Sequence, residues 1–139
     1  MKLTQESEYA IKIVLYLVKM DEAKLANARE ISDAEKLSVK FALKILRRLC
    51  KVKIIESFRG IKGGYKLKKS PSKINIKDIV EAMQGELYIS PSLKGVRRKD
   101  KLTDDIVNEF LFDIQDEIRN RFTTTTFEKL ISNSEIVKS

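Results

Sequence analysis

The strongest constraint on the fold is a change of periodicity after residue 51. Before it, apolar residues recur at helical spacing, and Ser38 is a good N-cap for a helix that runs to about Lys51. After it, residues 54–59 are rich in β-formers, Gly60-Ile61-Lys62-Gly63-Gly64 supplies turn residues, and residues 65–68 alternate apolar and basic side chains. The chain therefore predicts a helix followed directly by a β-hairpin with cationic arms and a cationic tip.

Helical signals account for most of the remaining chain. The expected helices are one near 5–20 capped by Thr4, a short one opened by Asn27 and Glu30, one capped by Asn75 and ended by Gly85, a long one from about Thr103 to Arg121, and a short terminal one opened by Thr125 and Glu128. The long helix carries a broad apolar stripe. Its members are Ile106, Val107, Phe110, Leu111, Ile114 and Ile118. The fold class predicted is mainly α with a small β-hairpin.

Two helices joined by a short turn and followed by a basic hairpin are typical of a winged helix-turn-helix. In that unit the second helix lies in the major groove of DNA, and its inner face packs on the rest of the domain. The predicted organisation is a DNA-binding domain over 1–85, a hinge loop over 86–102, and the long helix with a short C-terminal helix over 103–139.

Positive charge is concentrated on the same unit. The chain has a formal net charge of +8, and residues 36–69 hold 12 Lys and Arg but one acid, Glu56. Nucleic acid is the natural partner for such a field, because cations that neutralise phosphates release condensed counterions. An anionic membrane surface and an ordinary solvated face are the alternatives that charge alone leaves open.

The outer face of the second helix and the hairpin supply the candidate DNA contacts. Lys40 and Lys44 have the reach to touch base edges, and Leu43 suits a thymine methyl group. Arg47 and Lys51 are better placed for phosphates, whereas an arginine at the hairpin turn suits a narrow minor groove. The complete candidate set is Ser38, Lys40, Phe41, Leu43, Lys44, Arg47, Arg48, Lys51, Arg59 and Lys62.

Composition argues against enzymatic chemistry. The chain has no histidine and one cysteine, Cys50, so histidine-based catalysis and multi-cysteine metal sites within one chain are excluded. The glycine turn does not fit a P-loop, because Tyr65 follows Gly64 where a P-loop has lysine. We therefore expect a non-enzyme. For Cys50, a small buried hydrophobe is favoured over a redox sensor.

Two other binding functions stay open. A GxxG sequence also occurs in KH domains, which bind single-stranded RNA, although there it joins two helices. A winged helix that serves as a protein-interaction adaptor is the other alternative.

The N-terminus lacks a signal-peptide core, and no run approaches the roughly 20 apolar residues that span a bilayer. A cytoplasmic protein with no membrane partner is expected.

At this point the residues resemble a known family. Thr4, Tyr9-Ala10, the helix from Ser38 and above all the RGxxGGY turn over 59–65 are similar to the IscR/NsrR/CymR group of bacterial winged-helix transcription regulators, the Rrf2 type. The resemblance implies a homodimer that binds a pseudo-palindromic operator in double-stranded DNA, with dimer contacts that come largely from the long helix, so that residues 103–139 form a dimerisation unit. On the family pattern Lys40, Leu43 and Lys44 lie where bases are read, and Arg59 is the wing arginine. The dimer residues implied are Ile106, Phe110, Leu111, Ile114 and Ile118.

The sequence departs from that family in its loop. The best-known members carry three cysteines before the dimer helix, which bind an iron–sulfur cluster, whereas residues 86–105 contain none. The chain thus resembles the cluster-free branch, and no cofactor is expected. An effector metabolite or partner protein, where one exists, is expected to act on the loop, and such dimers commonly repress by occluding RNA polymerase. Lys36 and Lys53 stand where the family usually has glycine.

Overall fold

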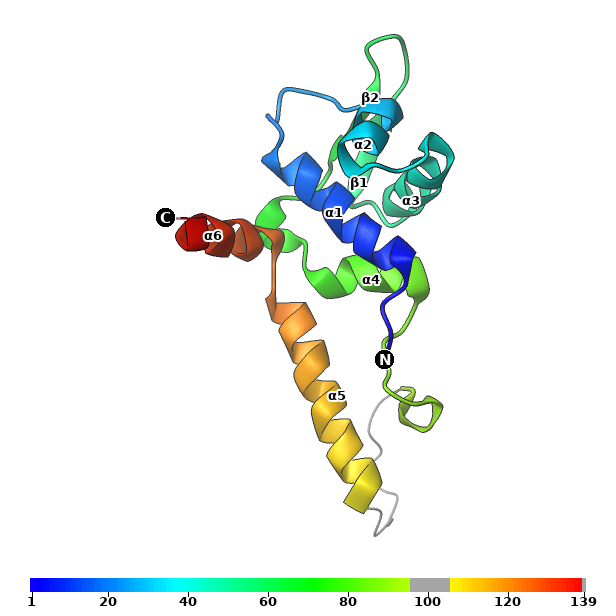
Figure 1. The fold of residues 1–139 in the computed structure, drawn as a ribbon, viewed down its shortest axis with the longest axis vertical. Helices are drawn as coiled ribbons and strands as arrows, with labels where there is room; N and C mark the ends of the chain where they lie inside the picture. The colour runs from blue at the N-terminus through cyan, green and yellow to red at the C-terminus, as the bar shows by residue number, and fades with distance from the viewer. Residues whose placement is uncertain (96–105, 139) are drawn as a thin grey trace.

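The computed structural model describes residues 1–95 and 106–138 (Figure 1). In chain order its elements are α1 (Gln5–Lys19), α2 (Ala28–Glu35), α3 (Val39–Lys51), β1 (Ile55–Phe58), β2 (Gly64–Leu67), the 3-10 turn η1 (Pro71–Lys73), α4 (Ile76–Gln84), the 3-10 turn η2 (Pro91–Leu93), α5 (Ile106–Thr124) and α6 (Phe127–Lys138). The predicted fold class, mainly α with one hairpin, is confirmed. The predicted helix start at Thr103, residues 96–102 of the predicted hinge loop and Ser139 lie outside the described residues.

Side-chain caps set the helix boundaries. The Thr4, Asn27 and Ser38 side chains accept hydrogen bonds from the third backbone N–H of α1, α2 and α3. Asn75 and Asp78 form a reciprocal capping box at the start of α4, which ends at Gly85. The predicted cap of the last helix was wrong by one residue. The Thr126 hydroxyl accepts from the N–H of Lys129 (3.2 Å), because the Thr125 hydroxyl donates back to Arg121 O.

The hairpin is antiparallel and is extended by a bridge to the segment before α2. Ile55 pairs with Leu67, and Phe58 pairs with Gly64. Tyr65 N donates to Ala26 O (2.8 Å), and Ala26 N donates to Tyr65 O (3.1 Å). A Cβ on Gly64 would lie 2.7 Å from Ala26 O, so this close approach requires glycine. Gly64, the last glycine of the RGxxGGY turn, thus fixes the hairpin against the helical part of the domain.

One core joins the N-terminal elements, and α6 contributes to it. In Figure 1, α1 crosses the domain with α2, α3 and the hairpin on one side and α4 on the other. Phe127 of α6 is fully buried, and its N–H donates to Ile74 O (3.0 Å). The α6 helix is therefore packed on the same core as the helix-turn-helix. The fully buried core includes Ala10, Ile13, Val14, Ile31, Ile45, Leu46, Leu49, Ile74, Ile79 and Val80.

The α5 helix projects from the rest of the molecule. Figure 1 shows it extending away from the hairpin, which lies at the opposite end. Ile106, Val107 and Phe110 are 83, 64 and 60% exposed, so much of the predicted apolar stripe has no cover from its own chain. Leu111, Ile114 and Ile118 are half-buried. Across the described residues, no helix combines the length and apolar character that crossing a membrane requires.

Candidate nucleic-acid interface

The inner face of α3 fixes which of its side chains reach the surface. Ala42, Ile45, Leu46 and Leu49 are buried, and the hydroxyl of Ser38 caps the helix by accepting from Phe41 N (3.1 Å). The opposite side carries cations. The exposed cations on α3 and just beyond it are Lys40, Lys44, Arg47, Lys51 and Lys53. This outer face is the surface that a major groove would meet in a winged helix-turn-helix.

Two lysines occupy the left-handed region at the ends of this unit. Lys36, which ends α2, has φ 56° and ψ 48°, and Lys53, between α3 and β1, has φ 63°. These are the positions where the sequence departs from the family glycines. A side chain there costs about 1 kcal/mol of backbone strain. The turn between α2 and α3 thus keeps the left-handed geometry without a glycine. Each of the two lysines adds a positive charge beside α3.

The hairpin turn presents two cations and an apolar tip. Arg59 and Lys62 are exposed, and Ile61 between them is fully exposed. On the strands below, the ammonium of Lys66 lies 5.0 Å from the ring centroid of Phe58, a cation–π contact that orders the arm.

The β-strands lie against the C-terminal half of α3. Burial raises the pKa of the Tyr65 phenol, as does the neighbouring Cys50, and the positive charge of Arg47 partly offsets these effects. Burial likewise raises the pKa of the Cys50 thiol, and a hydrogen bond with Ser57 of β1 partly offsets it. These contacts place the cationic outer face of α3 beside the wing.

Several predicted DNA-binding residues have contacts within the protein. Phe41 packs edge-on against Tyr9, with ring centroids 5.9 Å apart, and Leu43 is half-buried. Arg48 donates to Glu6 Oε2 (2.8 Å) and to Met83 O (2.9 Å). Lys44 donates to Glu6 Oε1 (2.9 Å).

The other five cations of the predicted set are exposed. They are Lys40, Arg47, Lys51, Arg59 and Lys62, and in residues 1–95 and 106–138 none of them takes part in a salt bridge. Their charges are therefore available to a partner. The first three lie on α3 and the last two on the adjacent hairpin turn.

Sequence reasoning missed a clasp between α5 and the segment after α4. Gln115 is fully buried; its Oε1 accepts from Ile89 N (2.8 Å), and its Nε2 donates to Leu93 O (3.0 Å). One turn later, Arg119 Nε donates to Leu87 O (2.8 Å), and its Nη2 pairs with Glu86 (3.3 Å). The sequence signal that could have indicated this clasp is Gln115 itself, a polar residue within the apolar stripe of the long helix.

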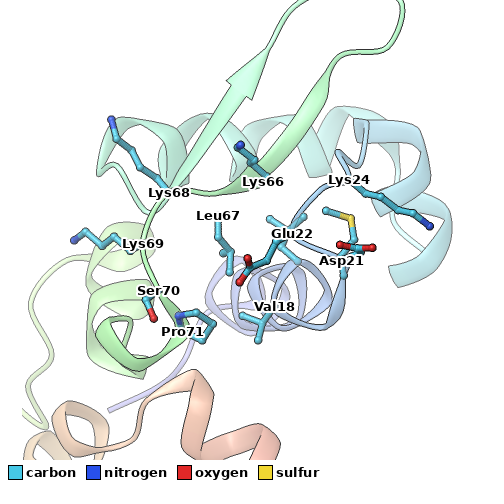
Figure 2. Close-up of a pocket in the computed structure, with 12 residues that line it drawn as sticks. Val18, Asp21, Glu22, Lys24, Lys66, Leu67, Lys68, Lys69, Ser70 and Pro71 are labelled. Atoms are coloured by element: carbon cyan, nitrogen blue, oxygen red, sulfur yellow. The ribbon is translucent and has the colours of Figure 1, made fainter.

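A groove of about 340 Å³ opens on another part of the domain, between the end of α1 and the segment from β2 to η1. Figure 2 shows Leu67 directed toward α1 and charged side chains around the rim. Both signs are present in the lining, which includes Asp21 and Glu22 together with Lys24, Lys66, Lys68 and Lys69.

Fold and surface together define a winged helix-turn-helix protein with a projecting helix. The family model described as "Iron-dependent Transcriptional regulator", Rrf2, matches residues 3–133. The chain belongs to the Rrf2 family of transcriptional regulators, as the RGxxGGY turn predicts.

Individual relatives agree with this assignment. The crystallised CymR of B. subtilis, titled the global cysteine regulator, superposes with a TM-score of 0.80 at 25% identity, over 96% of this chain and 98% of that one. The regulator NsrR of Geobacillus kaustophilus is 36% identical over 89 residues, 64% of this chain and 60% of the relative. NsrR of Shouchella clausii is 31% identical over 89 residues, again 64% and 60%. The matched segment thus spans about three fifths of these curated relatives.

The family description implies iron, but the residues of this chain do not fit an iron–sulfur cluster. Such clusters are held by several cysteine thiolates, and the chain has one cysteine and no histidine. That cysteine, Cys50, lies half-buried on α3, and burial raises the pKa of its thiol, which disfavours the thiolate a metal needs. Among the residues described, no group of three or more His, Cys, Asp or Glu side chains is placed to hold a metal.

Proposed function

We propose that this chain is a cluster-free, homodimeric repressor that binds a pseudo-palindromic operator in duplex DNA. The observation that carries the proposal is a set of exposed cations on α3 and the adjacent wing that form no salt bridge in the described part of the chain: Lys40, Arg47, Lys51, Arg59 and Lys62. Membership of a family of transcriptional regulators supports it independently.

In the proposed complex, α3 enters the major groove. Lys40 and Lys44 face base edges, Arg47 and Lys51 hold phosphates, and Arg59 enters the flanking minor groove. Ser38, Phe41 and Arg48 act indirectly in this arrangement, because they cap α3 or pack it against α1 and α4.

The exposed apolar face of α5 supports a twofold dimer. Ile106 and Phe110 are 83 and 60% exposed, which suits burial against a second copy of the chain. The dimer would place two α3 helices in successive major grooves about 34 Å apart. Residues 1–85 would then bind DNA, residues 103–139 would dimerise, and the loop over 86–102 would connect them.

The clasp made by Gln115 and Arg119 supports a coupling role for this loop. These side chains attach Leu87, Ile89 and Leu93 to α5, so an effector metabolite or partner protein on the loop would move the dimer helix relative to the DNA-binding domain. Such a motion changes the separation of the two α3 helices.

Charge reversal tests the DNA-binding surface. Arg47→Glu and Arg59→Glu are expected to weaken binding to duplex DNA at least tenfold each and to leave the oligomeric state unchanged. Lys73→Glu is the matched control, because Lys73 is exposed on η1, away from α3 and the hairpin turn in sequence and fold. Electrophoretic mobility shift with genomic fragments selected by the purified protein is the measurement.

Two outcomes would reject the proposal. Binding that survives both reversals would place the interface elsewhere. A preference for single-stranded RNA over duplex DNA, measured at equal salt, would replace the operator with the RNA-binding alternative.

A further inference from the structure

The acidic side chain of Glu6, on α1, contacts two cations of α3. Glu6 lies in the first turn of α1, and its two carboxylate oxygens bind different cations of α3: Oε1 lies 2.9 Å from Lys44 Nζ, and Oε2 lies 2.8 Å from Arg48 Nη1. The hydrogen bond from Lys44, with the charges of Lys44 and Arg48, holds the pKa of Glu6 below its usual value despite partial burial. Glu6 is therefore a carboxylate at neutral pH.

The two cations differ in how firmly they are held. Arg48 is also bound to Met83 O on α4 (2.9 Å), so it is fixed from two sides and in turn fixes the carboxylate of Glu6. Lys44 has no such second contact among the hydrogen bonds of the described residues, and 53% of its side chain is exposed. Lys44 is the partner that can leave, and Glu6 stays in place when it does.

The salt bridge between Glu6 and Lys44 lies within the row of cations on the outer face of α3. Lys40, Lys44, Arg47 and Lys51 follow one another at spacings of four, three and four, which puts them on one stripe of α3. Lys44 stands inside that stripe, and within the described residues it alone of the four is in a salt bridge. A phosphate that bound its ammonium would have to break the salt bridge with Glu6 and would lie near the carboxylate, which Arg48 holds in place.

We propose that Glu6 is a specificity-determining residue that withholds Lys44 from backbone phosphates, so that Lys44 adds little to sequence-independent binding. This inference rests on the proposed function. With Glu6 in place, Arg47 and Lys51 are the α3 cations that hold phosphates in the proposed complex. Removing the carboxylate would turn Lys44 into one more phosphate contact.

The salt dependence of binding to a mixed-sequence 30-base-pair duplex tests this directly. Each phosphate contact contributes about 0.9 to the slope of log K against log salt, so Glu6→Gln is expected to steepen the slope by about 0.9 and to tighten binding about fivefold at 0.15 M salt. Glu8→Gln is the matched control, because Glu8 is exposed in the same first turn and its loss changes net charge equally. Its slope is expected to equal that of the parent chain.

Substitution of Lys44 gives a second, independent test. Lys44→Met is expected to leave the slope of the parent chain unchanged and to abolish the gain in the Glu6→Gln background. A slope that falls by about 0.9 when Lys44 is replaced in the parent chain would overturn the inference, because Lys44 would then already hold a phosphate. Equal slopes for Glu6→Gln and Glu8→Gln would overturn it as well.

The failure of this inference is distinguishable from the failure of the proposed function. Arg47→Glu reports on the surface itself. Loss of duplex binding in Arg47→Glu, together with unchanged slopes in Glu6→Gln, would reject only the role of Glu6. Duplex binding that is absent in the parent chain, or unaffected by Arg47→Glu, would reject the proposed function.

Discussion

At the scale of single residues, the backbone at Lys36 shows a conflict between local geometry and side-chain choice. Its φ of 56° lies in the left-handed region, which glycine adopts without steric cost. Lysine at this position keeps a cation next to α3, at the expense of folding stability. A similar conflict exists at Lys53 (φ 63°).

Replacing Lys36 by glycine is expected to stabilise the fold. Lys36→Gly should raise the free energy of unfolding by about 0.5–1 kcal/mol, since the strain relieved exceeds the added entropy of the unfolded chain. Urea denaturation followed by circular dichroism measures the change. Lys12→Gly, in the middle of α1, is the control and should lower the free energy of unfolding by about 1 kcal/mol. Destabilisation by both substitutions would contradict the strain argument.

Cys50 provides a pH-dependent prediction. Burial raises the pKa of its thiol in the folded chain, with partial offset from Ser57, so the unfolded chain loses this proton at lower pH than the folded chain does. Folding stability should therefore be complete below the ordinary value of 9.0 and decline as pH rises through it. Tyr65, whose pKa is also raised, adds to the decline above its ordinary value of 10.0.

Two measurements check this behaviour. Urea denaturation at pH 8, 9 and 10 should show constant stability below pH 9, a decline above it in the parent chain, and a smaller decline in Cys50→Ser. Alkylation by iodoacetamide at pH 8 should be slower in the folded chain than in the urea-unfolded chain, because the thiolate is the reactive form. Equal alkylation rates would indicate that the thiol is neither buried nor shifted.

Short-range sequence patterns predicted the helix caps well, but they did not predict which residues far apart in the sequence pair with each other. The caps at Ser38 and Asn75 were predictable because a capping side chain and the backbone N–H that donates to it lie three residues apart. The pairing of Glu6 with Lys44 joins residues 38 positions apart, and no sequence pattern encodes which surface acid meets which surface base. The same limit applies to Arg48: its place on the helix predicted an outward cation, but its contact with Met83 O depends on how α4 packs.

At the scale of elements, the clasp on α5 determines how the projecting helix is held. Apart from the bonds of Arg119, the side chain of Gln115 supplies the buried hydrogen bonds between α5 and residues 89–93 in the described part of the chain. A buried amide that satisfies two backbone groups is costly to remove, since both groups are left without partners. The position of α5 relative to the preceding segment thus depends in part on this polar side chain, which acts together with Arg119.

Gln115→Ala is expected to loosen this junction. The free energy of unfolding should fall by about 1–3 kcal/mol, because Ile89 N–H and Leu93 C=O lose their partner. Hydrogen exchange provides the sharper readout, as the Ile89 amide should lose its protection while amides of α3 keep theirs. Glu117→Ala, exposed on the same helix, is the control and should change stability by less than about 0.5 kcal/mol. Unchanged protection at Ile89 would show that another contact holds the loop.

At the scale of the whole molecule, the two ends have opposite character. Figure 1 shows the hairpin and α3 at one end and α5 projecting at the other. Exposed cations characterise the first end, and exposed Ile106, Val107 and Phe110 characterise the second. In the dimer that we propose, this separation would let α5 form the interface while both DNA-binding surfaces stay accessible. It also makes the two functions separable by mutation.

Phe110→Glu tests that separation. A carboxylate is costly to bury at the proposed apolar dimer contact, so the variant should elute as a monomer of 16.0 kDa in size-exclusion chromatography with light scattering. Asn120→Glu is the control, because Asn120 is an exposed polar residue on the same helix, and it should leave the dimer intact. Binding to a two-half-site duplex should weaken by about 10²–10⁴, because the second half-site is no longer held at high effective concentration. Binding to a duplex with one half-site should change little. A dimeric Phe110→Glu would place the interface on another face, and a monomer that kept full affinity for two half-sites would mean that each subunit binds DNA independently.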